Sequence, residues 1–332
     1  MLTQNVYLGL DYSRLLGASS YRQLRRIVGQ FLTEIEPAEY RARADAVAAA
    51  VAATDADVVA LQEASLFRKQ EPGDFASTGG DRASTEVVDL LAEVERALEA
   101  RGLRYDRAAV TATSDAELPA ETNDGSVDLR VTDRNALLVR AGVDVNDVVT
   151  KSYDMDLSLT VPGTEQEVAL RRGYARADVA TDGAEFTAVS THLESVSSFL
   201  RVVQARELLD GLRGSNPVVL CGDLNSGPGY EPAAYDMLTD SFTDSYDRVN
   251  PQAKGNTCCQ SPDLRNDRSQ LSRRIDAVLR RGDLRATDVS RVNHRRTDRV
   301  RVDGDSNGDS DGRSGSVWPS DHAGIVATFE AT

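Results

Sequence analysis

Lysine is scarce in this chain, and long hydrophobic runs are absent from it. Lys69, Lys151 and Lys254 are the only lysines, so nearly all of the basic residues are arginines. No apolar segment approaches the ~20 residues that a membrane-spanning helix requires, and no basic-then-apolar signal peptide is visible. The sequence therefore predicts a protein without a transmembrane segment, located in the cytoplasm, or exported if a leader is missing from this chain.

Cysteine is also scarce, with three residues in 332. Cys221 lies in the apolar run VVLC, which is typical of a small buried hydrophobic residue. Cys258 and Cys259 are adjacent, and adjacent cysteines rarely form a disulfide because the ring that closes is small and strained. The spacing of paired cysteines that marks a structural zinc site is absent, so no such site is expected.

Negative charge dominates, since 53 Asp and Glu residues against 38 Lys and Arg residues give a net charge of −15. A surface rich in Asp and poor in Lys indicates a halophilic protein, in which hydrated carboxylates maintain solubility and high salt screens their repulsion. This acidity weighs against tight non-specific binding to duplex DNA. It leaves nucleic acid open as a substrate, because a small Arg-lined cleft can lie within an acidic surface.

The chain lacks a Pro-, Gly- or Ser-rich linker and a repeat of fixed period, which favours one domain over residues 1–332. A monomer is expected. Strands and helices share the first half of the chain, and the second half is mostly strands. One open sheet would hardly use so many strands. We therefore predict an α/β fold in which two stacked sheets carry helices on their outer faces.

The hydrophobic periodicity places the individual elements. Helices are expected over residues 14–36, 37–53 and 199–212, and a further one between a Ser84 cap and Gly102. The polar stretch 113–132 is expected to be a loop. A hairpin around Asp182-Gly183 joins strands 174–180 and 185–191, and other strands are predicted at 57–62, 105–111, 136–140, 218–221, 274–279 and 325–329.

Short motifs that carry acids, amides or histidines follow the buried strands. Each places an Asn, Glu, His or Asp on or just past a run of apolar, mostly β-branched residues. Five such groups at strand ends are hard to explain as solvated surface, and together they outline one phosphoester-cleaving centre. The motifs are TQNVYLG (3–9), VVALQEAS (58–65), VSTHLES (189–195), VVLCGDLN (218–225) and WPSDHAGIVATF (318–329).

The first two motifs offer ligands for a magnesium-type ion, which prefers carboxylate and amide oxygens. Glu63 closes a buried strand and is the leading candidate, and Asn5 adds a neutral oxygen if the two strands are neighbours. A helix N-cap or a surface salt bridge is the alternative for Glu63, and a turn-forming side chain is the alternative for Asn5.

In CGDLN, Gly222 permits a sharp exit from the strand. Asp223 and Asn225 are two residues apart, so an extended segment points both the same way. The carboxylate can then orient or deprotonate a water molecule, and the amide can hold a phosphate oxygen. An Asx-turn at the end of the strand is the alternative.

Histidine is the side chain whose proton affinity suits acid–base work near neutral pH. His322 can act as a base or hydrogen-bond the phosphate, with Asp321 beside the metal. Asp276, in RRIDAVLRR, can orient His322 through its second ring nitrogen. His192 can hold the phosphate or the leaving oxygen.

The ordered set LQE, STHL, GDLN, RID and SDH resembles the endonuclease/exonuclease/phosphatase superfamily, which includes pancreatic-type deoxyribonuclease, inositol polyphosphate phosphatases and bacterial sphingomyelinases. The resemblance runs from Asn5 to Phe329. It implies a four-layer α/β sandwich of two packed, mostly antiparallel β-sheets flanked by helices, with a Mg²⁺ or Mn²⁺ centre.

The resemblance also implies roles for single residues. Asn5, Glu63 and Asp321 match the metal side, Asp223 and Asn225 the water-activating and phosphate-holding pair, and Asp276 with His322 the carboxylate–imidazole pair. His192 matches a second catalytic histidine. Arg172 resembles an arginine that grips phosphate, and Asn135 lies in a segment that lines the cleft. Tyr7 departs from the pattern, because abasic-site endonucleases carry an Asp there, which weakens the case for an abasic substrate.

An acidic stretch near the C-terminus matches a calcium-loop pattern through Asp303, Asp305, Asn307 and Asp311. A complete EF-hand loop has Glu at its twelfth position, where this chain has Ser314. A bound Ca²⁺ and a solvated acidic loop are therefore both compatible with the stretch.

The combined motifs predict a divalent-metal-dependent phosphoester hydrolase that uses in-line attack of water. A phosphodiesterase or nuclease is the first interpretation, with nucleic acid as the partner. A phosphatase or sphingomyelinase-like hydrolase of inositol or lipid head groups is the alternative. A non-catalytic binding module would have lost some of the acids, which are all present here. An Arg-rich groove near His322 would favour a polynucleotide, and an apolar rim would favour a lipid.

Overall fold

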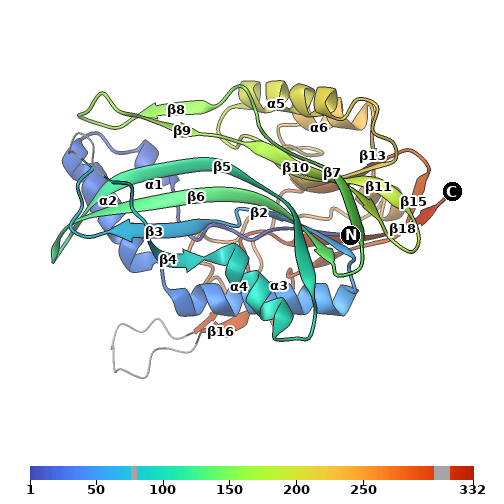
Figure 1. Cartoon of the computed structure of the whole chain (residues 1–332), viewed down its shortest axis with the longest axis horizontal. Helices are drawn as coiled ribbons and strands as arrows, with labels where there is room; N and C mark the ends of the chain where they lie inside the picture. The colour runs from blue at the N-terminus through green and yellow to red at the C-terminus, as the bar shows by residue number, and fades with distance from the viewer. Residues whose placement is uncertain (76–80, 303–314) are drawn as a thin grey trace.

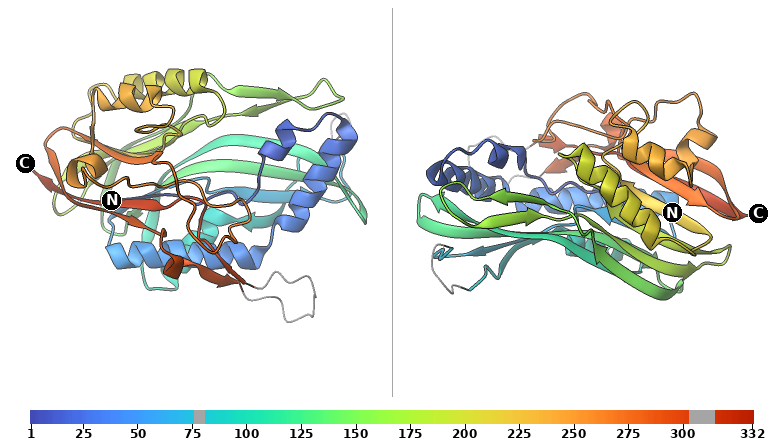
Figure 2. Two further views of the ribbon diagram at one scale, coloured as in Figure 1. Left: turned by 180° about the vertical axis from the view of Figure 1, so that it is seen from behind. Right: turned by 90° about the horizontal axis from the view of Figure 1, so that it is seen from above.

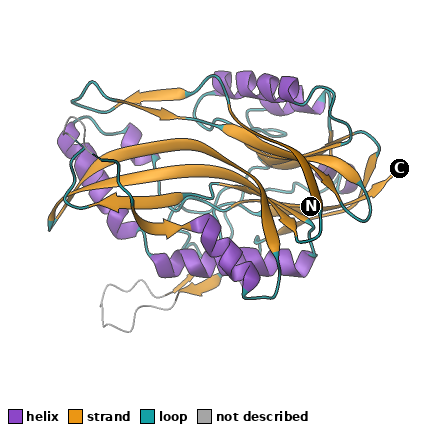
Figure 3. Ribbon diagram, viewed as in Figure 1, coloured by secondary structure: helices purple, strands orange, loops and turns teal. Residues whose placement is uncertain are grey.

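Two β-sheets pack face to face between two layers of helices (Figures 1 and 3). A computed structural model describes residues 1–75, 81–302 and 315–332 of the chain. The predicted four-layer α/β sandwich with mostly antiparallel sheets is confirmed.

The first sheet joins the two ends of the chain. Strand β1 (Leu2–Asn5) lies between β18 (Gly324–Ala331), with which it is antiparallel, and β2 (Val58–Gln62), with which it is parallel. Within the described residues this sheet has eight strands. The others are β15 (Leu284–Val292), β6 (Gly125–Arg140), β3 (Leu66–Gln70), β4 (Thr85–Asp89) and β5 (Tyr105–Thr122), which pairs with β6.

The second sheet comes from the middle of the chain. Its parallel pair is β11 (Glu185–His192) with β12 (Val218–Asp223), and its other pairings are antiparallel. In the part of the chain that the structure describes, the order across this sheet is β13 (Thr243–Asp244), β14 (Asp276–Arg281), β12, β11, β10 (Gly173–Ala180) and β7 (Asp144–Ser152).

The alternation of side chains along the strands separates the inner core from the outer cores. In β2, Val58 and Ala60 pack between the sheets, whereas Val59 and Leu61 pack against the helices. In β12, Val219 and Cys221 face the inner core, whereas Val218 and Leu220 face outward. Both faces of these strands are therefore buried, which explains their almost uninterrupted apolar sequences.

Helices cover the outer face of each sheet (Figure 2). The first sheet carries α2 (Tyr21–Glu34), α3 (Pro37–Thr54) and α4 (Leu90–Glu99), and the second carries α5 (Ser198–Gly211) and α6 (Ala233–Thr239). The predicted helices over 37–53 and 199–212 are confirmed within one residue. Shorter elements are α1 (Ser13–Leu16), α7 (Ser245–Val249), a 3₁₀ turn η1 (Arg296–Asp298) and the strand pairs β8 (Leu157–Thr160) with β9 (Glu167–Leu170) and β16 (Val300–Val302) with β17 (Gly315–Val317).

Two of the predicted helices have different boundaries in the structure. The helix expected over 14–36 is interrupted after α1, and α2 restarts at Tyr21, because the Ser20 side chain accepts the Gln23 amide as an N-cap. The Ser84 cap is wrong: residues 85–89 form β4, and α4 is capped by Asp89, which accepts the Ala92 amide.

The stretch 113–132 was expected to be a loop and is part of the long hairpin β5–β6. Its apolar residues pair across the hairpin, Leu118 with Leu129 and Ala120 with Val127. The prediction was wrong because polar residues alternate with these apolar ones, and because the Asp124-Gly125 turn signal was not used.

Asp303, Asp305, Asn307 and Asp311 of the calcium-loop pattern lie outside the described residues. No helix among the described residues is long and apolar enough to cross a membrane.

Candidate active site

Strand register brings residues from four strands into one row at the same end of the second sheet. Gly173, next to Arg172, pairs with His192, His192 pairs with Asp223, and Asp223 pairs with Asp276. His192, Asp223 and Asp276 have the parity of the inner-core residues on their strands, so they point between the sheets. The sequence separates these residues widely, and the sheet aligns them.

The space between the sheets becomes polar as it approaches this row. Gln62 on β2 donates to Ser190 Oγ on β11 at 3.0 Å, and Thr3 Oγ1 donates to Gln62 Oε1 at 3.3 Å. These buried groups satisfy one another, as burial requires. They lie between the sheets, next to the charged residues that both sheets contribute to the site.

Asn5 links the two sheets. Its Nδ2 donates to Glu63 Oε1 and to Asp223 Oδ2, both at 3.1 Å, while its Oδ1 accepts the Tyr7 amide at 2.9 Å. Glu63 has a left-handed backbone (φ 56°) directly after β2, and its Oε2 accepts the Leu8 amide at 2.8 Å. A buried residue that is not glycine rarely adopts this conformation, and such strain concentrates at functional sites.

Gly222 allows the neighbouring strand to approach Asp223. A Cβ at this position would lie 2.0 Å from the carbonyl oxygen of Thr191, so no larger residue fits between β12 and β11. Asp223 Oδ1 accepts the Asn225 amide at 2.8 Å, which is the Asx-turn that was the alternative interpretation of this motif. The Asx-turn and the site contacts therefore coexist in one side chain, since Oδ2 faces Asn5.

Asn225 is not extended, as the sequence argument assumed, but left-handed with φ 47°. Its Nδ2 nevertheless turns toward the row and lies 3.1 Å from His192 Nε2 and 3.0 Å from the Leu193 carbonyl oxygen. His192 Nε2 is also 3.5 Å from Asp223 Oδ2. The turn thus brings the side chains of both Asp223 and Asn225 close to His192 Nε2.

His322 and Asp276 form a buried pair, with Nδ1 and Oδ2 2.8 Å apart. The other ring nitrogen, Nε2, lies 3.8 Å from Asp223 Oδ2 and 3.9 Å from Asp321 Oδ1. The Thr257 hydroxyl accepts the amide of Asp276 at 3.2 Å and so fixes the start of β14. This arrangement leaves Nε2 directed at the centre of the carboxylates.

Arg172 lies on the far side of His192 and is 8% exposed. Its Nη1 is 3.1 Å from His192 Nδ1 and 3.5 Å from Asp133 Oδ2, and its Nε is 4.0 Å from Glu194 Oε2. Asn135 is fully buried, and its Nδ2 donates to the Gly173 carbonyl oxygen at 2.8 Å. Asn135 therefore supports the backbone beside Arg172.

The sequence interpretation missed Asp133, Glu194 and Thr257. Asp133 lies two residues before Asn135 on one strand, and Glu194 lies two residues after His192, so spacing offered a signal for both. Thr257 lies in a segment without a motif, and no feature of the sequence singled it out.

Burial opposes ionisation of the carboxylates. Desolvation, together with the charges of Asp133 and Asp321, raises the pKa of Glu63 to about 7. Desolvation also raises the pKa of Asp223 to about 6, with Asp276 adding repulsion, and it raises the pKa of Asp321. Burial therefore favours the protonated forms of these three carboxyl groups.

The pKa values of the two histidines shift in opposite directions. Burial lowers the pKa of His322, but Asp276, Asp321 and Asp223 outweigh it and raise the pKa well above its usual value. Burial and the neighbouring Arg172 lower the pKa of His192 well below its usual value. These shifts favour the protonated form of His322 and the neutral form of His192, and the difference suits them to different roles.

The donor set fits a hard divalent cation. Glu63 and Asp321 are carboxylates that are reluctant to ionise without a counter-charge, and they lie beside the close group of Asp223, Asp276 and His322, in which Asp276 is already paired with the His322 ring. Carboxylate oxygens are the ligands of Mg²⁺ and Mn²⁺. The Asn5 oxygen is occupied by the Tyr7 amide, and its amide nitrogen faces the acids.

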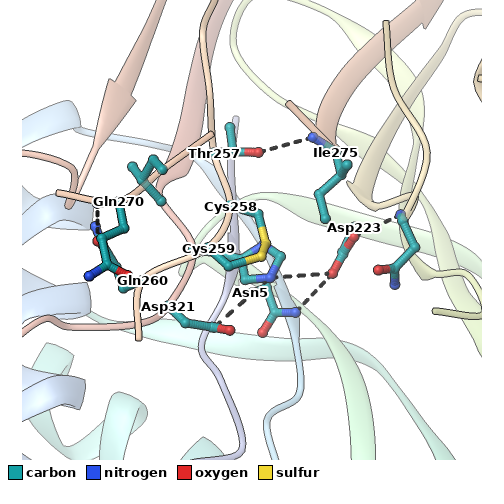
Figure 4. The surroundings of a disulfide bond; sticks show 12 residues. Asn5, Asp223, Thr257, Cys258, Cys259, Gln260, Gln270, Ile275 and Asp321 are labelled. Atoms are coloured by element: carbon teal, nitrogen blue, oxygen red, sulfur yellow. Dashed lines mark hydrogen bonds and ion pairs between the residues drawn. A yellow bond between two sulfur atoms is a disulfide. The ribbon is translucent and has the colours of Figure 1, made fainter. Parts of the chain in front are cut away.

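Cys258 and Cys259 form a disulfide beside this cluster (Figure 4), contrary to the expectation that adjacent cysteines stay apart. The segment is held on both sides: Arg273 donates its amide to the Cys258 carbonyl at 2.9 Å, and Ala323 donates to the Thr257 carbonyl at 2.7 Å. Their sulfur atoms lie within 4.8 Å of a His322 ring nitrogen. In a disulfide they are not thiolate ligands for a metal.

Comparison with known proteins identifies related sequences and folds. The sequence profile described as the Endonuclease/Exonuclease/phosphatase family matches residues 2–322. No curated protein sequence matches the chain at a significant level.

Similar solved structures include a mannosyl-6-phosphatase from Bacteroides thetaiotaomicron, with 17% identity, a TM-score of 0.57 and coverage of 99% of this chain and 98% of that chain. An endonuclease/exonuclease/phosphatase family protein from the same organism has 16% identity, a TM-score of 0.58 and coverage of 100% and 97%. TDP2 from D. rerio, complexed with a single-strand DNA product, has 17% identity, a TM-score of 0.54 and coverage of 99% and 98%. At these identities the likeness shows the fold alone.

Proposed function

Since the chain belongs to the endonuclease/exonuclease/phosphatase family, we propose that it is a divalent-metal-dependent hydrolase of phosphoester bonds. One observation carries the proposal: Asp223 lies within 3.8 Å of Asn5, His192 and His322, all buried and drawn from both sheets. A solvated surface would not assemble these groups, and neither would a packed core, because their desolvation destabilises the fold.

The family is generally dependent on a divalent metal, and Glu63 and Asp321 are the carboxylates that we assign to it, with Asn5 beside them. When bound, Mg²⁺ or Mn²⁺ would neutralise charge on the phosphate oxygens and on these acids. The raised pKa values of Glu63 and Asp321 support this assignment, because a nearby cation would favour their ionised forms.

The residues of the chain then divide the remaining work. Asp223 orients a water molecule and accepts its proton, a task for which a pKa of about 6 is well placed near neutral pH. Arg172, Asn225 and the neutral His192 bind phosphate oxygens. His322, protonated and held by Asp276, donates a hydrogen bond to the phosphate or to the leaving oxygen.

Phosphodiesters are the first substrate class that we propose, with nucleic acid among them. A phosphatase is the second, and both classes have a relative of the same fold, since one similar structure is a mannosyl-6-phosphatase and another is TDP2 complexed with a DNA product. An apolar cavity beside Arg172 favours an ester that carries a hydrophobic group, as argued below.

A substrate panel tests the proposal. Bis-p-nitrophenyl phosphate, p-nitrophenyl phosphate, plasmid DNA, RNA, sphingomyelin and phosphoinositides are incubated with the protein and Mg²⁺ or Mn²⁺, at low and at molar salt. We expect turnover of at least one phosphodiester, its loss with EDTA and its recovery with added metal. Calorimetric binding of Mn²⁺ without turnover of any member would contradict the enzyme and indicate a binding module.

A further inference from the structure

An apolar cavity of about 160 Å³ lies next to the catalytic row, the aligned residues His192, Asp223 and Asp276 with Arg172 beside them. It is enclosed by α1 and α2, by the hairpin β5–β6 and by the pair β8–β9. Most of its lining is aliphatic or aromatic and includes Leu10, Leu24, Phe31, Leu118, Val131 and Leu159. Interiors are normally packed without voids of this size, so a cavity here is a place for something to bind.

The cavity and the catalytic row share residues. Arg172 and Asp133 line the cavity, and Arg172 Nη1 is also 3.1 Å from His192 Nδ1. Among the described residues, the Arg172 Nε has no hydrogen-bond partner, although the side chain is nine-tenths buried. A phosphate bound by Arg172 and His192 would therefore stand at the polar end of an otherwise hydrophobic space.

The cavity opens toward solvent at α1. Leu16 lines it and is 44% exposed. Tyr12, another lining residue, is hydrogen-bonded through its hydroxyl to Ser195 Oγ at 2.8 Å, and the nearby residues Val196 and Phe199 have exposed hydrophobic side chains. Leu16 therefore gives this opening an apolar side chain, which suits a hydrophobic group better than a charged one.

We propose that this cavity binds an apolar substituent attached to the phosphate of the substrate. The inference deepens the proposed function and rests on it. A dry cavity of about 150 Å³ lined by similar side chains accommodates benzene, which sets the substituent at roughly six carbons. The next phosphate of a polynucleotide does not belong there, because burying an unpaired charge among leucines is strongly unfavourable.

Alkylphosphonates test the cavity without requiring turnover. The dissociation constants of methyl-, butyl-, hexyl- and decylphosphonate are measured by calorimetry with the Mn²⁺-loaded protein. Each buried methylene contributes about 0.8 kcal/mol, so affinity should rise up to about fourfold per carbon until roughly hexyl and then level off. A benzylphosphonate arm separates a ring from a chain as the preferred shape.

Matched variants locate the effect. Leu159→Trp fills the cavity and should bring the hexyl-to-methyl affinity ratio close to one. Ser158→Trp, at an exposed position of β8 that is not among the cavity-lining residues, should keep the ratio of the parent protein. Ala116→Leu fills the same cavity from β5 and replaces Leu159→Trp if that variant does not fold.

The possible outcomes separate the inference from the function. Affinity that does not depend on chain length would overturn the inference, even if bis-p-nitrophenyl phosphate is hydrolysed. The inference would also be overturned if Ser158→Trp abolishes the length dependence as fully as Leu159→Trp does. Length-dependent binding by a protein that hydrolyses no phosphoester would overturn the proposed function and the substrate assignment with it. Length-dependent binding, lost in Leu159→Trp, together with turnover supports both.

Discussion

The two sides of Arg172 are built in opposite ways. On the His192 side, short motifs at strand ends supply buried carboxylates and imidazoles that the sheet register aligns. On the other side, α1–α2 and two hairpins enclose a cavity lined by leucines and valines without any motif. Both sides lower the stability of the fold, the first because it buries charge and the second because it leaves apolar space unfilled.

Removing the charge of Asp223 is the change with the largest expected effect. Asp223→Asn should lower turnover of bis-p-nitrophenyl phosphate roughly 10²–10⁴-fold, because the group that orients water and takes its proton is lost. In EDTA at pH 8 the variant should be more stable than the parent by about 1–2 kcal/mol. The folded pKa of about 6 lies above the unfolded value near 3.9, so the ionised form destabilises the fold there.

Urea denaturation and steady-state kinetics measure the two effects. Asp288→Asn, on the exposed side of β15, is the control and should change neither. An active Asp223→Asn would contradict the role that we assign to this carboxylate.

Replacing Arg172, which lies between the two sides, should lower the stability of the fold in addition to removing a phosphate-binding group. Arg172→Met leaves Asp133 and Glu194 buried without their cation and should destabilise the fold by about 3–5 kcal/mol. Arg171→Met is the matched control, since Arg171 is exposed and its pair with Asp156 contributes about 0–1 kcal/mol. Equal urea midpoints for the two variants would show that Arg172 is not needed to neutralise these acids.

Substitutions of Asp276 and His322, alone and together, test whether Asp276 acts through His322. Asp276→Asn should lower kcat about 10²-fold because His322 loses the partner that fixes its ring. If Asp276 works only by positioning His322, then the double variant with His322→Ala loses no more activity than His322→Ala alone. Additive losses in this double-mutant cycle would assign Asp276 a separate function.

A substitution that fills the cavity tests the apolar side of Arg172. Ala116→Leu should stabilise the fold by about 1 kcal/mol, because its added carbons occupy empty apolar space, and should weaken the binding of hexylphosphonate. Ala112→Leu, exposed on the same strand, serves as the control in thermal unfolding. Destabilisation by Ala116→Leu would mean that the space is smaller than the structure indicates.

The smallest effect concerns Asp115, beside the cavity on β5. Burial raises the pKa of its carboxyl, but hydrogen bonds from Arg130 and Thr132 outweigh burial and lower the pKa to about 2. The ionised form is thus favoured in the folded state, so its contribution is complete above the unfolded pKa near 3.9 and is lost as the pH falls toward 2. Asp115→Asn should lower the Tm slightly at pH 6, with a difference that vanishes near pH 2; a difference that grows on acidification would refute this.

The sequence predicted the site residues on the His192 side of Arg172 because each of them lies in a short, local motif. Most of the functional residues lie at a strand end or within two residues of one, as Glu63, Asp223 and His322 do, and a strand end can be recognised within a short motif. The same reasoning failed for the hairpin β5–β6, whose half-buried strands resemble a polar loop, and hence for the cavity that this hairpin closes. It also did not anticipate the disulfide between Cys258 and Cys259, which lies in a segment that is hydrogen-bonded to Arg273 on one side and Ala323 on the other.

The amino-acid sequence alone determined the family, the layered α/β architecture and the residues that carry acid, amide and imidazole groups, because periodicity and strand-end chemistry are local properties of a chain. Only the tertiary structure decided that Asp223 meets residues from both sheets, that the pKa values of His322 and His192 shift in opposite directions, and that Arg172 borders an apolar cavity. Distances across sheets, desolvation and enclosed volume arise from the packing of segments that are remote in the chain, and no local pattern encodes them.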